Sequence, residues 1–249
     1  MSNKKRLFLM SVFAVTAIVL LLPAPVQYFV APDLESRPNV SFPSYEATIA
    51  QNEKGVAIVN NPDSILVLVN KNRHLPDFYT PNDLIIPNVR FSFRGDREKM
   101  KMRKEAARAL ENLFQAAEQD KVYLFAVSAY RSYERQKALH TMYKKNEGAA
   151  VTAVSSAVPG TSEHQTGLAV DVSAQSVHFQ LEPSFGNTKE GKWLAAHAHE
   201  FGFIIRYPDN KTATTGYMYE PWHIRYVGNP HARYLYERRL TLEEAMPKK

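Results

Sequence analysis

The chain of 249 residues contains no cysteine. Without a thiol it cannot use a cysteine nucleophile, form a disulfide, build a cysteine zinc finger or carry a lipid on cysteine. A protein outside the cytoplasm can do without disulfides if its core is large enough. Because 45% of the residues are hydrophobic, a chain of this length suits one domain with a sizeable core.

Several catalytic motifs are also missing. The sequence has no Gly-x-Ser-x-Gly elbow, no phosphate-binding loop and no His-Glu-x-x-His helix of the kind found in zinc proteases. Its one Ser-x-x-Lys runs from Ser2 to Lys5, in the N-terminal tail. A serine penicillin-binding mechanism is therefore unsupported.

Positive charge is in modest excess, with a formal net charge of +6 among 22% charged residues. No basic block is interleaved with stacking aromatic residues, so we expect no nucleic-acid partner. A polyanionic surface, such as a bacterial wall or anionic lipid, fits the charge equally well. A solvated basic surface without a specific partner accounts for most of these charges.

The N-terminus combines positive charge with an apolar run. Basic residues at positions 4–6 precede an uncharged stretch over residues 7–22, close to the ~20 residues of a membrane-spanning helix. Prolines stand where a signal peptidase would have to cut. We therefore predict that residues 1–26 are an uncleaved anchor with its positive end in the cytoplasm. Cleavage and release is the alternative, and a buried core helix is less favoured because the segment has no polar face.

The remainder is predicted to be a linker followed by one domain. Residues 27–55 carry several prolines and little periodicity, so they are predicted to be the linker, and residues 56–249 the domain. Because helical and strand patterns mix without regular βαβ alternation, we predict an α+β fold with a mostly antiparallel sheet and flanking helices, preceded by one N-terminal apolar helix. Strands are predicted at 58–59, 65–69, 123–127, 167–173, 203–207 and 222–227, and helices at about 96–120, 132–146, 189–200 and 230–239.

Two segments carry the residue types of a metal site. His164 and Asp171 flank a Gln-Thr-Gly turn sequence, and Glu220 and His223 flank Pro-Trp. Two imidazoles and one carboxylate leave a coordination position of zinc open for water, and a further glutamate can take a proton from that water. This inventory predicts a hydrolytic zinc site.

The spacing of these residues places two demands on the fold. A β-strand rises ~3.3 Å per residue, so His164 and Asp171 reach one metal only if the chain turns near residues 165–167. Glu220 and His223 would point to opposite faces of a regular strand. Both can face one pocket if Glu220 lies just before the strand and the following proline breaks its regularity.

Four other histidines lie in predicted helices without partner ligands. His197 and His199 are two residues apart, which places them on different faces of a helix. His140 and His231 have no identifiable partner either. We predict that all four are structural or surface residues.

Four ordered blocks of sequence extend the metal-site pattern. They are Ser-Ala-Tyr-Arg-Ser at 128–132 with Gln136, Pro-Gly-Thr-Ser-Glu-His-Gln-Thr-Gly-Leu-Ala-Val-Asp at 159–171, Phe-Gly-Phe at 201–203 with Arg206-Tyr207-Pro208, and Glu-Pro-Trp-His-Ile-Arg-Tyr-Val-Gly at 220–228. On these blocks, roughly residues 60–240 resemble the VanY family of D-alanyl-D-alanine carboxypeptidases. That family lies within the clan of lysostaphin-like, D-Ala-D-Ala and hedgehog-type zinc folds.

The resemblance implies a role for each residue of the metal site. His164, Asp171 and His223 are implied to bind Zn2+. Glu220 is implied to be the general base that activates water and hands the proton to the leaving amine. A nearby cation is expected to keep the Glu220 carboxylate ionised at neutral pH, as a base must be.

The resemblance also implies residues that hold the substrate. Arg131 would bind the substrate carbonyl or its terminal carboxylate with its guanidinium fork, and Ser162 and Gln136 would hydrogen-bond the substrate. The alternatives are that Arg131 pairs with a core carboxylate, Ser162 caps a turn and Gln136 is a solvated helix residue. Glu163 is expected to point away from the metal, and Trp222 to pack in the core.

The function implied is a zinc-dependent carboxypeptidase, a monomer, that removes the C-terminal D-alanine from peptidoglycan stem peptides. It would act at the extracytoplasmic face of the cytoplasmic membrane, or be secreted if the N-terminal segment is cleaved. L,D-carboxypeptidase activity on the tetrapeptide stem is left open. A non-catalytic zinc-containing wall-binding module is the rival of another class, and Glu220 argues against it. An endopeptidase is a third option, but a cation such as Arg131 would close one end of the cleft.

Overall fold

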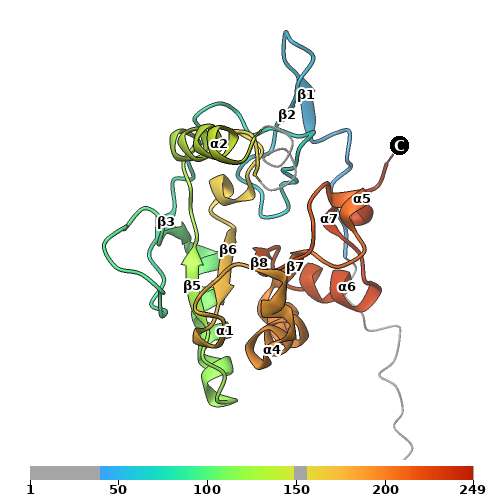
Figure 1. Cartoon of the computed structure of the whole chain (residues 1–249). Helices are drawn as coiled ribbons and strands as arrows, with labels where there is room; N and C mark the ends of the chain where they lie inside the picture. Colours follow the sequence, from blue (N-terminus) through green and yellow to red (C-terminus); the bar gives the residue numbers. More distant parts are fainter. Residues whose placement is uncertain (1–39, 149–155, 249) are drawn as a thin grey trace, which may run out of the picture. The chain divides into compact units, whose positions relative to one another are not determined.

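A four-stranded antiparallel sheet forms the centre of the folded unit (Figure 1). The structure is a computed structural model, and it describes residues 40–148 and 156–248. The strands of the sheet lie in the order β5 (Phe125–Ser128), β6 (Ala169–Ser173), β8 (Glu220–Tyr226) and β7 (Phe203–Tyr207). All of β6 is buried, so this strand is covered on both faces. The predicted α+β class with a mostly antiparallel sheet is confirmed.

Helix α1 (Lys104–Gln119) supplies much of the core that covers the sheet. Its apolar residues recur every three or four positions, and the face they make, including Leu110 and Leu113, is fully buried together with Val170 of β6 and Ile224 of β8. The helix begins later than predicted. Residues before Lys104 instead form β4 (Met102–Arg103), which pairs with β3 (Leu84–Ile85).

A second long helix follows β5, and the later α-helices of the described residues are shorter. Helix α2 (Tyr133–Glu147) has the predicted N-cap, because the Ser132 hydroxyl accepts a hydrogen bond from the backbone N–H of Arg135 at 3.4 Å. The remaining α-helices are α4 (Lys189–His197), α5 (Thr212–Thr215), α6 (His231–Arg238) and α7 (Leu242–Ala245). Single 3-10 turns are η2 (Glu163–Thr166), η3 (Gln175–Val177), η4 (Pro183–Asn187) and η5 (Ala198–Phe201).

The predicted linker over residues 27–55 overlaps the folded unit. From residue 40 onward the chain packs against the domain, and β1 (Ile49–Gln51) pairs with β2 (Ala57–Val59). The carbonyl oxygen of Tyr45 accepts a 2.7 Å hydrogen bond from Arg73, whose side chain is 1% exposed. The boundary predicted at residue 56 is therefore corrected, because it falls inside this hairpin.

The apolar run at residues 65–69 is not the predicted strand. Buried arginines take up carbonyl oxygens that a strand would offer to a neighbouring strand: Arg225 donates to Ile65 at 3.0 Å and to Val67 at 2.8 Å, and Arg73 donates to Leu68 at 3.1 Å. The segment is buried because it is apolar. Its backbone carbonyl oxygens accept hydrogen bonds from guanidinium groups and not from a neighbouring strand.

The predicted N-terminal anchor, residues 1–26, lies outside the described residues. Between residues 40 and 148 and from 156 to 248, no helix combines the length and the apolar character that crossing a bilayer requires.

The turn between η2 and β6 depends on Gly167. This residue has φ = 67°, and a Cβ placed on it would lie 2.8 Å from Leu84 Cδ2 and 3.0 Å from Arg103 Cγ. The left-handed backbone and the lack of space both select glycine. The demand that the chain turn near residues 165–167 is therefore met.

We expect Gly167→Ala to lower the free energy of unfolding by about 2–5 kcal/mol, the sum of left-handed strain and overpacking. Chemical denaturation of both proteins measures the difference. Gly95→Ala is the matched control, because Gly95 also has a positive φ, of 93°, but a Cβ added to it would meet nothing within 4 Å. An equal loss in the two variants would show that close packing around Gly167 is unimportant.

Candidate metal centre

Three donor side chains converge where η2 meets the sheet. One donor atom from each of His164, Asp171 and His223 lies within 4.8 Å of the others, and all three residues are buried. Asp171 and His223 are direct partners across the β6–β8 ladder, and the η2 turn brings His164 back toward them. The structure thus brings together all three predicted metal ligands.

Hydrogen bonds orient both imidazoles toward Asp171. His164 Nδ1 lies 2.7 Å from the carbonyl oxygen of Ala129, which leaves Nε2 facing Asp171 Oδ2 at 3.3 Å. His223 Nδ1 lies 3.0 Å from Asp171 Oδ1. The two rings meet edge to face, with centroids 4.9 Å apart. Two imidazole nitrogens and a carboxylate converging in this way are a donor set that fits Zn2+.

Burial and mutual attraction set the charges of the three donors. Burial alone would raise the pKa of Asp171, but the two histidines outweigh it and hold that pKa below its usual value. Burial lowers the pKa of His164, which favours the neutral ring that a metal needs. For His223 burial also acts downward, but the neighbouring carboxylates of Asp171 and Glu163 outweigh it and raise the pKa to about 9.

Glu220 shares a cavity of about 270 Å³ with the three donors. It is the first residue of β8 and pairs with Tyr207, while Ile224 pairs with Ile205. These two pairs are four residues apart on β8 but only two residues apart on β7, so the ladder is irregular here. Pro221 lies within the irregular part of β8. This irregularity places both Glu220 and His223 at the cavity, with Glu220 inside the strand and not just before it as predicted.

Burial raises the pKa of Glu220 to about 7, although His223 acts in the opposite direction. Without a bound cation, this carboxyl is therefore about half protonated at neutral pH. The ionised form expected of a base depends on additional positive charge at the site, which a metal held by the three donors would supply.

Arg131 faces the same cavity, and its hydrogen-bond partners are neutral. Its guanidinium donates to Gln136 Oε1 at 2.9 Å and to Ser128 Oγ at 3.2 Å. Among the ion pairs of the described residues, none joins Arg131 to a carboxylate within 4 Å. The alternative that Arg131 pairs with a core carboxylate is therefore not what the structure contains, and its charge is available to an anionic group in the cavity.

Ser162 and Gln136 occupy different positions relative to the cavity. Ser162 lines it, and its hydroxyl does not cap the η2 turn that follows. Gln136 is 1% exposed, and its amide donates to the carbonyl oxygen of Ala157 at 2.6 Å while accepting from Arg131. Gln136 is thus not a solvated helix residue but lies behind Arg131. A direct contact of Gln136 with substrate stays a prediction.

Sequence reasoning missed Glu163, which was expected to point away from the metal. Its side chain is fully buried, and Oε2 lies 3.5 Å from His223 Nε2. Its other oxygen accepts hydrogen bonds from Arg206 and Arg225. The signal in the sequence was an arginine within each of two apolar strands, because such arginines need a buried carboxylate nearby.

Aromatic rings complete the walls of the cavity. Tyr207 packs against His223 with centroids 4.9 Å apart and against Tyr217 at 4.6 Å. Trp222 is 9% exposed and belongs to the core, as predicted, but its edge also lines the cavity. Aromatic side chains therefore form part of the wall around the polar reacting groups.

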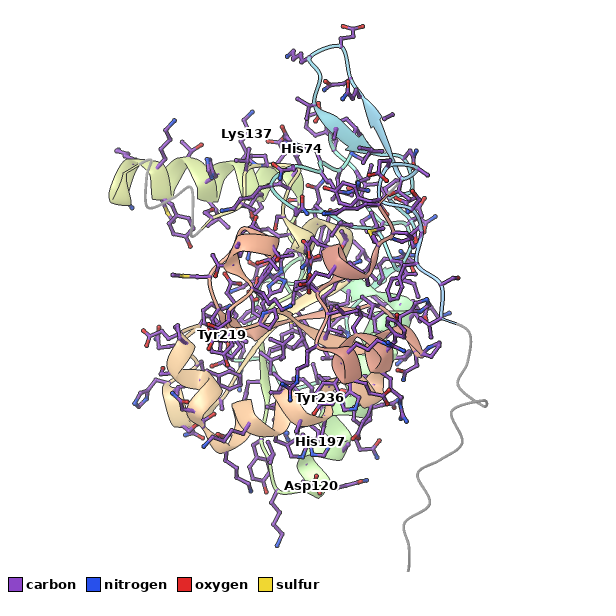
Figure 2. All side chains as sticks on the ribbon, turned by 90° about the vertical axis from the view of Figure 1, so that its right-hand side faces the viewer. His74, Asp120, Lys137, His197, Tyr219 and Tyr236 are labelled. Atoms are coloured by element: carbon purple, nitrogen blue, oxygen red, sulfur yellow. The ribbon has the colours of Figure 1, made fainter. Side chains whose placement is uncertain are left out.

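His197 and His199 do not line the cavity of the metal donors. His197 stacks on Trp193, whose indole N–H donates to Asp120 at 2.7 Å, and Figure 2 shows His197 and Asp120 near the same edge of the molecule. His199 stacks on Tyr236 with a centroid distance of 3.7 Å. The prediction that these histidines are structural or surface residues is confirmed for this pair.

A buried cluster of two histidines and an aspartate, with a glutamate and an arginine facing the same cavity, defines a metal-dependent hydrolase. Residues 99–229 match the family described as VanY, D-alanyl-D-alanine carboxypeptidase. The chain belongs to the VanY family of carboxypeptidases, which confirms the predicted family and class of enzyme.

The similar proteins agree with this assignment. The chain is 50% identical over 196 residues to a protein of Bacillus subtilis (strain 168) that is named as the candidate carboxypeptidase YodJ. The match covers 78% of this chain and 71% of that protein. It is similar to the LdcB LD-carboxypeptidase, with a TM-score of 0.76 and 46% identity over 81% of this chain and 95% of that one. A mutant of the vancomycin-resistance D,D-pentapeptidase VanY from the VanB-type cassette, in complex with Zn(II), gives a TM-score of 0.60 and 36% identity over 73% and 98%. These findings and the donor set support zinc as the metal.

We expect zinc affinity to rise with pH up to about 9. The pKa of His223 is raised to about 9 in the metal-free chain, so below that pH a metal must displace a proton from the imidazole ring. The apparent affinity should therefore increase by about tenfold per pH unit between pH 7 and 8.5. Chelator competition at several pH values measures it, and a pH-independent affinity over this range would contradict the proton displacement.

Proposed function

We propose that the chain removes the C-terminal D-alanine from peptidoglycan stem peptides by cutting the D-Ala-D-Ala bond of the pentapeptide. One observation carries this proposal most directly. The Arg131 guanidinium, with neutral hydrogen-bond partners, faces the cavity that holds the metal donors and Glu220. A cation at this place suits the free carboxylate of a terminal residue, which an endopeptidase substrate does not present.

The residues of the chain divide the reaction among them. Arg131 binds the terminal carboxylate, and the hydroxyl of Ser162 lies in the same cavity to hydrogen-bond the peptide. The metal, when held by the two histidines and Asp171, supplies Lewis-acid polarisation of the scissile carbonyl. The Glu220 carboxylate takes a proton from the attacking water and gives it to the departing amine as the C–N bond breaks. D-Alanine leaves with a neutral amine and an intact carboxylate.

An L,D-carboxypeptidase acting on the tetrapeptide stem is the second candidate. The similarity to the LdcB LD-carboxypeptidase favours it. Both substrates end in D-alanine, so both need Arg131, and they differ in the residue before the cut bond. Ala157 and Leu181 line the cavity. Their side chains are apolar, which suits an alanine methyl but does not by itself select one configuration.

We further propose that the enzyme works outside the cytoplasm, held by residues 1–26 as a membrane anchor, with the chain up to residue 39 as its linker. The basic flank and apolar run of the N-terminus support this arrangement, as does the location of a wall substrate. Protease added to intact spheroplasts should digest the catalytic unit. Protection of that unit would contradict the proposed orientation.

The assay of the proposed function uses the zinc-loaded full chain with three peptides. We expect loss of one alanine from the stem pentapeptide, read as a mass change over time. The C-terminally amidated pentapeptide should react about 10- to 100-fold more slowly, because a charge-assisted bond to Arg131 is worth about 1.5–3 kcal/mol. Loss of alanine from the tetrapeptide alone would establish the L,D activity. No loss from any peptide, in a folded and metal-loaded sample, would favour a wall-binding module.

Glu220→Gln should lower kcat by about 10²- to 10⁴-fold, because the amide cannot take up the proton. The zinc content should stay at the wild-type level, since Glu220 is not among the three donors. Glu134→Gln, an exposed glutamate on α2, is the matched control and should keep full activity. Activity of Glu220→Gln within a few-fold of wild type would rule out the proposed base.

A further inference from the structure

Glu163 is a buried carboxylate next to a metal ligand in the chain, and the reaction described above does not use it. Its side chain has no exposed surface. Burying a carboxylate is costly unless its charge is compensated and its oxygens are hydrogen-bonded. The partners of its two oxygens therefore show what it does.

The first oxygen is fixed by two buried arginines. Glu163 Oε1 accepts hydrogen bonds from Arg206 Nε and Arg225 Nη1, both at 2.7 Å. Arg206 is held at its other end by Glu243, at 2.8 and 2.6 Å. Arg225 is held by the carbonyl oxygens of Ile65 and Val67. The charges of these two arginines and two glutamates balance, so this buried frame compensates the Glu163 carboxylate and holds it in one orientation.

The second oxygen faces His223. Glu163 Oε2 lies 3.5 Å from His223 Nε2 without forming a hydrogen bond to it, and neither atom has a hydrogen-bond partner among the described residues. The opposite nitrogen of the same ring, Nδ1, lies 3.0 Å from Asp171. His223 thus stands between two carboxylates, one on the metal side and one on the arginine side.

We propose that Glu163 is a positioning residue that keeps a proton on Nε2 of His223 and so presents the lone pair of Nδ1 to the metal. A carboxylate behind a ligating histidine selects the tautomer and the ring orientation. Only Oε1 of Glu163 is needed to bond the two arginines. Oε2 is directed at Nε2 of the His223 ring instead. The inference rests on the metal centre of the proposed function, but not on which peptide is cut.

Glu163→Gln and Glu243→Gln form a matched pair for testing this role. Each removes one buried carboxylate that bonds Arg206, but only Glu163 faces His223. In the full chain, chelator competition should show zinc binding weakened about 10- to 100-fold by Glu163→Gln. Glu243→Gln should stay within about threefold of wild type. Wild-type affinity in folded Glu163→Gln, or an equal loss in both variants, would overturn the proposal.

A measurement on the wild-type protein decides the question even if Glu163→Gln fails to fold. Nitrogen-15 NMR of the zinc-loaded full chain, labelled at histidine, should find the His223 proton on Nε2 and the metal on Nδ1. A proton on Nδ1 would overturn the proposal. Neither readout uses a substrate, so a failed carboxypeptidase assay would leave both interpretable.

Discussion

The direct pairing of Asp171 with His223 across β6 and β8 is the contact on which the rest of the site depends. Side chains alternate along a strand, so a register shift of one residue would turn Asp171 to the other face of the sheet. The fold protects this register by burying β6 completely between α1 and the polar cavity. His164 then completes the donor set, because the turn at Gly167 returns the chain to the end of its own strand.

The cost of burying these charges explains the surroundings of the site. Asp171 is compensated by two imidazoles, and Glu163 by two arginines whose remaining donors bond Glu243 and backbone carbonyls. Such buried networks are favourable only when every charge has a partner, and removing one partner is strongly destabilising. The two arginines therefore belong to the core, and Glu163 is the member of this network that faces the metal centre. The apolar run at residues 65–69 takes part as well, because its carbonyl oxygens accept hydrogen bonds from Arg225 and Arg73.

The sequence predicted the fold class and the metal ligands because both depend on local patterns. His164, Asp171, Glu220 and His223 lie in short blocks, and the required turn could be located at Gly167. Glu163 could not be placed in this way, because its partners Arg206 and Arg225 lie 43 and 62 residues away. The run at 65–69 was mistaken for a strand, and the segment from residue 40 for a linker, for the same reason: distant side chains determine their structure.

The donor set predicts one zinc ion held by two histidines and one aspartate, with a coordination position left open. X-ray absorption at the zinc edge of the zinc-loaded chain tests it most directly. We expect four nitrogen or oxygen ligands at about 2.0–2.2 Å, two of them imidazoles, with one imidazole lost in His223→Ala. A six-coordinate shell of oxygen ligands, or an unchanged shell in His223→Ala, would contradict it.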